Sequence, residues 1–154
     1  MQAQQQLNWC WAAVAVSVAQ FYVAASPWSQ QCDVASQELG KTCCPAGSNT
    51  ACDIPWYLDL ALQRVKHLNT WAGGSVPMGT IQGEISGSHP TGARIAWSTG
   101  GGHFVVVSGY SSSPAGDFVT IEDPIWAQST LALSVFQSSY QGSGRWSHTY
   151  FTLP

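Results

Sequence analysis

The stretch Asn8-Trp9-Cys10-Trp11-Ala12-Ala13 opens the longest apolar run of the chain and places a cysteine where a helix is predicted to begin. Large apolar side chains then recur at helical spacing, at Trp11, Val14, Val18 and Phe21. This pattern predicts a helix over residues 9–24 with Asn8 as its N-cap. Unpaired backbone N–H groups at a helix start favour a thiolate. Cys10 is therefore our candidate nucleophile, and the alternative is a small buried apolar residue.

Helical patterns fill the first half of the chain, and strand patterns fill the second. Further helices are predicted over residues 29–39, from Asp53 as N-cap to about residue 68, and over residues 80–85. Strand-like runs separated by turn signals follow, at residues 93–98, 103–110, 118–123, 130–135 and 148–153. Helices followed by strands are typical of the α+β class. We expect one domain over residues 1–154, with a helical part over about 1–74 and a β part over about 75–154.

Composition narrows the classes of partner. Of the 154 residues, 45% are hydrophobic and 8% are charged, and the net charge is -3 with no basic cluster, which argues against nucleic acid. The apolar run over residues 9–25 is too short and too interrupted to span a bilayer. We therefore expect a monomer with neither a nucleic acid nor a membrane as its partner.

The five cysteines divide into one isolated residue, Cys10, and a group of four within 21 positions: Cys32, Cys43, Cys44 and Cys52. This division predicts two disulfides and one free thiol. A zinc site is less favoured because no Cys-x2-Cys pair occurs. A bond between the adjacent Cys43 and Cys44 would be strained, so Cys32 pairs with one of them and Cys52 with the other.

Disulfides indicate an oxidising compartment, so we expect a secreted or periplasmic protein. The sequence shows no export signal at its start. We therefore expect a mature form from which a leader, and with it a pro-segment, has been removed.

His103 follows three glycines and opens a strongly apolar run. A histidine beside a thiolate can take a proton as general base and return it to the leaving amine as general acid. His148 is the main rival because it also begins a predicted strand. Asp123 ends the run over residues 118–123, where we expect it to accept the second ring N–H of His103 and orient the ring. An ordinary turn is the alternative for an aspartate followed by Pro124.

Gln4 lies six residues before Cys10, and its side-chain amide could join the Cys10 backbone N–H as an oxyanion hole. The chain also holds eight tryptophans. Three of these flank the candidate site, and we expect them to line a substrate cleft: Trp9, Trp11 and Trp126.

Together these residues resemble the papain-like cysteine peptidases. The segment from Gln4 to Trp11 matches the pattern Gln-x5-Cys-Trp of that group, and the run from Gly101 to Tyr110 is similar to its histidine strand. The compact bacterial members, the staphopain-like and secreted-effector proteases, look most similar. They share Asn-Trp-Cys, Gly-Gly-His and Asp-Pro blocks at about this spacing, which is 93 residues from Cys10 to His103 and 20 more to Asp123.

The resemblance implies a two-lobed fold in which an N-terminal helical lobe faces a small antiparallel β-barrel-like lobe, with the active site in the cleft between them. It also implies a secreted endopeptidase that works through a thioester, without metal or cofactor. Its partners would be a protein or peptide substrate and a pro-segment or protein inhibitor. Two positions depart from papain, which has a cysteine in place of Leu7 and an asparagine in place of Asp123.

Two other functions fit the same sequence. A papain-like fold can also carry a toxin-like amidase, deamidase or acyltransferase with the same Cys-His-Asp site, because fold does not fix the substrate. A non-enzymatic binding module held together by its disulfides would use the tryptophans and would leave Cys10 unreactive.

Overall fold

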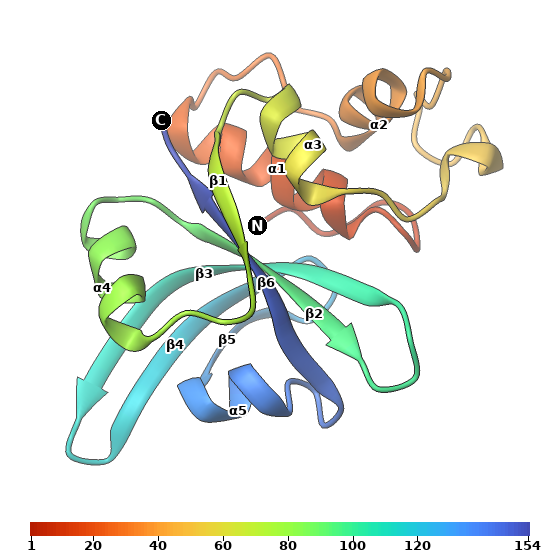
Figure 1. Cartoon of the computed structure of the whole chain (residues 1–154). Coiled ribbons are helices and arrows are strands. Elements are labelled where there is room, and N and C mark those ends of the chain that lie inside the picture. Colours follow the sequence, from red (N-terminus) through yellow and green to blue (C-terminus); the bar gives the residue numbers. More distant parts are fainter.

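An open antiparallel sheet of six strands and five α-helices make up the computed structural model, which describes all residues 1–154 (Figure 1). The α-helices are α1 (Cys10–Tyr22), α2 (Gln31–Leu39), α3 (Leu58–Arg64), α4 (Met78–Ser86) and α5 (Leu133–Ser138). The strands are β1 (Leu68–Gly73), β2 (Thr91–Trp97), β3 (Gly102–Ser113), β4 (Gly116–Asp123), β5 (Ala127–Ala132) and β6 (Gly144–Thr152). A short 3₁₀ helix, η1 (Thr50–Cys52), precedes α3. The predicted α+β class is confirmed.

The sheet has the strand order β1-β6-β2-β3-β4-β5, and every neighbouring pair is antiparallel. Strands β1 and β5 are its two edges, and they do not pair with each other. The expected barrel-like β part is therefore wrong. An open sheet is stable here because helices cover both of its faces, which removes the need for closure.

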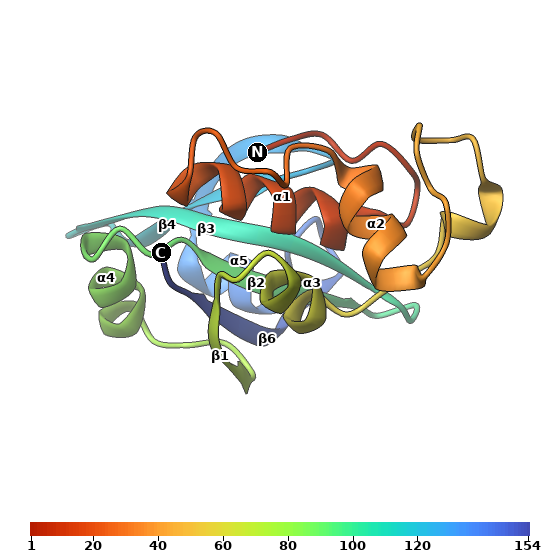
Figure 2. The ribbon, with the colours of Figure 1, turned by 90° about the horizontal axis from the view of Figure 1, so that it is seen from above.

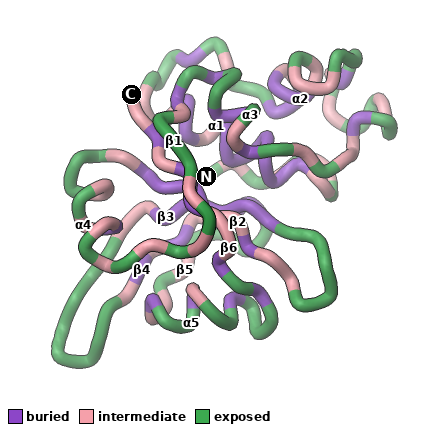
Figure 3. The backbone as a smooth tube through the Cα atoms, viewed as in Figure 1, coloured by how far each residue is buried: buried purple, intermediate pink, exposed green.

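Two hydrophobic cores lie on opposite faces of the sheet. Helices α1, α2 and α3 pack on one face, and α4 and α5 lie on the other (Figures 1 and 2). Strand β3 supplies Phe104 and Val106 to the first core and Val105 and Val107 to the second. A strand buried on both faces reads as a continuous apolar run, which explains the sequence after His103. Figure 3 shows the buried backbone concentrated along this strand and α1.

The start of the first helix differs from the prediction in its cap. Helix α1 begins at Cys10, but Asn8 does not cap it. Instead Asn8 is tied to Asp53, donating its backbone N–H to the Asp53 carboxylate at 2.8 Å and its side-chain amide to the Asp53 carbonyl at 3.1 Å. Asp53 is therefore not a helix cap either, and α3 begins only at Leu58. Helix α2 ends as predicted, with Gly40 in the left-handed conformation at φ 62°.

Two segments change type relative to the prediction. The third helix ends at Arg64, and Leu68–Gly73 forms edge strand β1, which pairs with β6 near the end of the chain. The predicted strand over residues 130–135 stops at Ala132, and α5 begins at the next residue, Leu133. Leu133 and Phe136 lie three positions apart, so one helical turn buries both in the second core.

The four clustered cysteines form two disulfides, as predicted. Cys32 bonds to Cys44 and Cys43 bonds to Cys52, while Cys10 is the free cysteine. These bonds tie α2 to η1 and choose between the two pairings that the sequence left open. None of the helices is both long and apolar enough to cross a bilayer.

Candidate active site

Cys10 is the first residue of α1, and its neighbours fix that helix start. Trp9 and Trp11 are fully buried on either side of it. Their indole N–H groups donate to the carbonyls of Cys52 at 2.7 Å and Ile54 at 3.1 Å. The helix start is thereby held against the disulfide-bonded segment. Cys10 itself is 8% exposed and lines the main cleft of the molecule, so its thiol is free and reachable.

His103 and Asp123 are brought together by the pairing of β3 with β4. The Nε2 atom of His103 lies 3.0 Å from each carboxylate oxygen of Asp123. His103 is 3% exposed and Asp123 is 2% exposed, so this pair is shielded from water. The two residues are 20 positions apart in sequence and meet because β3 turns back as β4.

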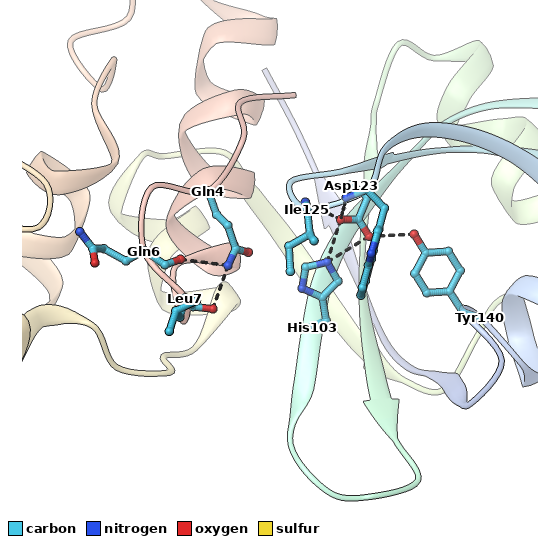
Figure 4. A network of polar contacts seen from close by, with 8 residues as sticks. Gln4, Gln6, Leu7, His103, Asp123, Ile125 and Tyr140 are labelled. Atoms are coloured by element: carbon cyan, nitrogen blue, oxygen red, sulfur yellow. Dashed lines mark hydrogen bonds and ion pairs between the residues drawn. The ribbon is translucent and has the colours of Figure 1, made fainter.

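Asp123 accepts further hydrogen bonds that fix its carboxylate. The backbone N–H groups of Ile125 and Trp126 donate to Oδ1 at 2.7 and 3.0 Å. The hydroxyl of Tyr140, a residue that the sequence analysis missed, donates to Oδ2 at 2.7 Å. Figure 4 shows the carboxylate between His103 and Tyr140. Nothing in the local sequence marks Tyr140, because its role depends on the fold of the segment between α5 and β6.

The buried pair is charged. Burial alone would lower the pKa of His103, but hydrogen bonds and charge from Asp123 and Cys10 outweigh it and raise this pKa to about 9. Burial would raise the pKa of Asp123, but the imidazole and the two backbone N–H donors overcome it and lower that pKa. At neutral pH the site therefore holds an imidazolium and a carboxylate. Burial and the Asp123 charge raise the pKa of Tyr140, which stays a hydroxyl donor.

Cys10 lines the same cleft as His103, and together with Asp123 it contributes to the raised pKa of that histidine. Because Nε2 of the ring is held by Asp123, Nδ1 is the nitrogen left for the sulfur. The site thus contains a free thiol and an imidazole that is bonded to a carboxylate. His148, the rival histidine, lines the same cleft, but its ring bonds only to the hydroxyl of its neighbour Ser147, at 3.1 Å.

Two tryptophans enclose the imidazole. The ring of Trp97 stacks on that of His103 with centroids 6.2 Å apart and planes 21° apart. Trp126 meets the same ring edge-on at 5.4 Å. These rings exclude water from the hydrogen bond between His103 and Asp123 and so strengthen it. Trp126 was among the predicted residues, whereas Trp97, at the end of β2, was missed.

The cleft that contains Cys10 and His103 has a volume of about 1000 Å³. Trp11 and Trp126 line it as predicted, but Trp9 does not. Trp9 is a core residue, because its indole is completely buried and hydrogen-bonded to Cys52. Side chains from the helical part and from the sheet both contribute to the walls of this cleft.

Gln4 does not offer its amide N–H groups to the cleft. Its Nε2 donates to the carbonyls of Gln6 at 2.9 Å and Leu7 at 2.8 Å, while its Oε1 is buried without a partner (Figure 4). Turning the amide over would set an oxygen against two carbonyls. The expected oxyanion role of Gln4 therefore does not fit this conformation. The backbone N–H of Cys10 remains available, because the first N–H groups of a helix have no partner within it.

Metal-binding side chains come together at one other place. Cys32, Asp33 and Cys44 lie close to one another, but the bond between Cys32 and Cys44 occupies both thiols. A metal would need thiolates there. No protein-family model matches this chain. A search of curated proteins finds no match for it.

Proposed function

We propose that this chain is a papain-like cysteine endopeptidase, which hydrolyses peptide bonds through a thioester on Cys10. The observation that carries this proposal is a set of three groups: the free Cys10 and His103, which line one cleft, and the buried Asp123, which is bonded to Nε2 of the His103 ring. A thiolate activated by a base that a third group orients is the arrangement required for nucleophilic catalysis.

The reaction follows from these positions. The Cys10 sulfur attacks the carbonyl carbon of the substrate, and the Cys10 backbone N–H donates to the oxyanion that forms. His103 gives the proton on Nδ1 to the leaving amine as the C–N bond breaks, and a thioester remains. His103 then takes a proton from water, the water oxygen attacks the thioester carbon, and the C–S bond breaks. Asp123 holds the ring in the orientation that both transfers need.

The same proposal assigns the two parts of the chain to two lobes. The expected boundary near residue 74 is too late, because strand β1 (Leu68–Gly73) belongs to the sheet. A helical lobe before β1 and a β lobe that includes it would face each other across the cleft. Support comes from the cleft walls, where Trp11 and Trp56 belong to the helical part and Phe104 and Tyr150 to the sheet. We also propose that the protein is secreted, because its two disulfides are stable in an oxidising compartment.

The direct test replaces the nucleophile. We expect Cys10→Ala to abolish hydrolysis of a denatured protein substrate, while circular dichroism and the melting temperature stay close to those of the parent protein. Alanine differs from cysteine only by the missing sulfur atom, so loss of fold is not expected at this barely exposed position. Full activity of the variant would overturn the proposal.

A second test needs no substrate. Brief treatment with iodoacetamide without reductant, followed by mass spectrometry, should label Cys10 quickly and leave the four disulfide cysteines unlabelled. Slow labelling of Cys10 would favour a binding module. Fast labelling together with no cleavage in a broad peptide and protein screen would favour an amidase, deamidase or acyltransferase on the same site.

A further inference from the structure

Arg94 places a positive charge in the cleft that also contains Cys10 and His103. It lies on β2 opposite Phe104 of β3 and His148 of β6. Opposite residues on antiparallel strands point to the same face, so these three side chains share one face of the sheet. All three line the cleft that also contains Cys10 and His103.

The guanidinium of Arg94 is held firmly but is not neutralised. Nη1 donates to the hydroxyl of Ser147 at 3.0 Å, and Nη2 is directed at the carbonyl of Gly101 at 3.4 Å. Arginine has five N–H donors, so three remain free. None of the ion pairs of the chain includes Arg94. Arg94 is only half-buried, so its remaining donors can bind water or the acceptor groups of a ligand in the cleft.

The backbone before His103 leaves room for this side chain. A Cβ atom at Gly102 would lie 2.8 Å from Nη2 of Arg94 and 2.9 Å from the carbonyl oxygen of Ile95. The guanidinium thus packs directly against the residue that precedes His103. A group bound by Arg94 would therefore lie in the same cleft as Cys10 and beside Gly102, the residue before His103.

Other charged groups in the cleft leave this position positive. Asp59, in the first turn of α3, also lines the cleft. Asp59 and Arg94 act in opposite directions on the pKa of Tyr150, which burial raises, so both lie near that ring. They do not form an ion pair. His103 carries the other positive charge, and its partner is Asp123.

We propose that Arg94 binds a carboxylate of the substrate, so that the chain prefers peptides with an acidic group next to the cleaved bond. This inference rests on the proposed peptidase function and names its substrate class. Planar carboxylates suit the guanidinium fork, which can donate two parallel hydrogen bonds to one carboxylate. The carboxylate has two sources, an aspartate or glutamate side chain within the peptide or the free C-terminus of the peptide.

The test first maps cleavage sites in a mixed peptide library by mass spectrometry. Pairs of peptides are then compared that differ only by Asp against Asn, or Glu against Gln, at one of the two positions on either side of the cleaved bond. A second set of pairs differs only by a free or an amidated C-terminus. We expect the wild-type protein to favour the carboxylate member of a pair by about tenfold in kcat/KM, the effect of one charge-assisted pair. Arg94→Gln should lose this preference, and Arg94→Lys should keep part of it.

Arg145→Gln is the matched control, because Arg145 is an exposed cation on β6 that does not line the cleft. It should keep the full preference. Asp59→Asn should keep or increase the preference, since it removes a negative charge from the cleft. A preference for internal acids identifies a side chain as the ligand, and a preference for free C-termini identifies a terminal carboxylate. An equal preference in wild type and Arg94→Gln would overturn the inference.

A failure of the peptidase proposal would look different, because the wild-type protein would cleave no peptide. Arg94 is then tested by the rates at which iodoacetate, which carries a carboxylate, and the neutral iodoacetamide alkylate Cys10. The rate with iodoacetate divided by the rate with iodoacetamide should be lower in Arg94→Gln than in the wild type. The same quotient should be unchanged in Arg145→Gln. An unchanged ratio in Arg94→Gln would overturn carboxylate binding by Arg94.

Discussion

At the scale of single residues, the candidate site depends on how Asp123 is held. Its carboxylate accepts from the His103 ring, from two backbone N–H groups and from the Tyr140 hydroxyl. Each donor stabilises the charged form of Asp123, and the charged carboxylate in turn keeps a proton on His103. The pKa values of the site are therefore set by neighbours that the sequence does not place together.

Replacing Asp123 with Asn should move the pH profile of the reaction. The pKa of His103 is raised to about 9, so the imidazolium is present below that pH and is lost above it. Without the carboxylate charge this pKa falls, and the alkaline limb of kcat/KM against pH should shift below pH 9. Asp117→Asn, at the exposed far end of β4, should leave the profile unchanged. An unchanged alkaline limb in Asp123→Asn would show that the carboxylate does not control the imidazole.

Tyr140 acts through Asp123 and is a positioning residue. We expect Tyr140→Phe to lower kcat about threefold to tenfold with little change in KM, because losing one hydrogen bond to a buried carboxylate loosens the orientation of His103. The control is Tyr22→Phe, which removes a hydroxyl bonded to Thr152 away from the cleft. If both variants lower kcat equally, the effect belongs to general stability and not to the site.

At the scale of elements, the disulfide-bonded segment supports the start of α1. The bond from Cys43 to Cys52 fixes the residue whose carbonyl accepts the Trp9 indole N–H, one position before Cys10. The bond from Cys32 to Cys44 holds α2, and neither of its cysteines is the residue that accepts the Trp9 indole N–H. The two disulfides should therefore contribute differently to the nucleophile.

Serine replacement of each cysteine pair separates these roles. Each double variant should lose about 2–3 kcal/mol of unfolding free energy in chemical denaturation, as expected for loops of this size. Only Cys43→Ser with Cys52→Ser should also slow iodoacetamide labelling of Cys10, because it loosens the carbonyl that anchors Trp9. Equal labelling rates in the two variants would contradict the link between this disulfide and the helix start.

At the scale of the whole molecule, the buried imidazolium links stability to pH. The pKa of His103 rises from 6.5 to about 9 on folding, so its stabilising contribution is complete below pH 6.5 and is lost as pH rises through about 9. The contribution is about 3 kcal/mol at most, at 1.36 kcal/mol for each pKa unit. The unfolding free energy is measured by chemical denaturation at pH 6.5 and at pH 9.5. Its decrease between these two pH values should be larger for the wild type than for His103→Gln. Parallel losses would refute the linkage.

Much of the fold can be predicted from local patterns. The start of α1 at Cys10, the end of α2 at Gly40 and the apolar core of β3 each depend on a few neighbouring residues. Strand β1 was missed because its signal is its pairing with β6, almost 80 residues away. Short elements such as α5 also escape prediction, since one turn of helix and a strand share the same apolar spacing.

The sequence by itself determined the α+β class, the two disulfides with one free cysteine, and which cysteine, histidine and aspartate to consider. These properties depend on residue type, local periodicity and short spacing. Only the tertiary structure decided the disulfide pairing, the open sheet, the bonds made by the Gln4 amide, the bond of Tyr140 to Asp123, and the positions of Trp97 and Arg94 at the cleft. Those depend on contacts between strands and helices far apart in the chain, where packing and burial select one arrangement from many that local patterns allow.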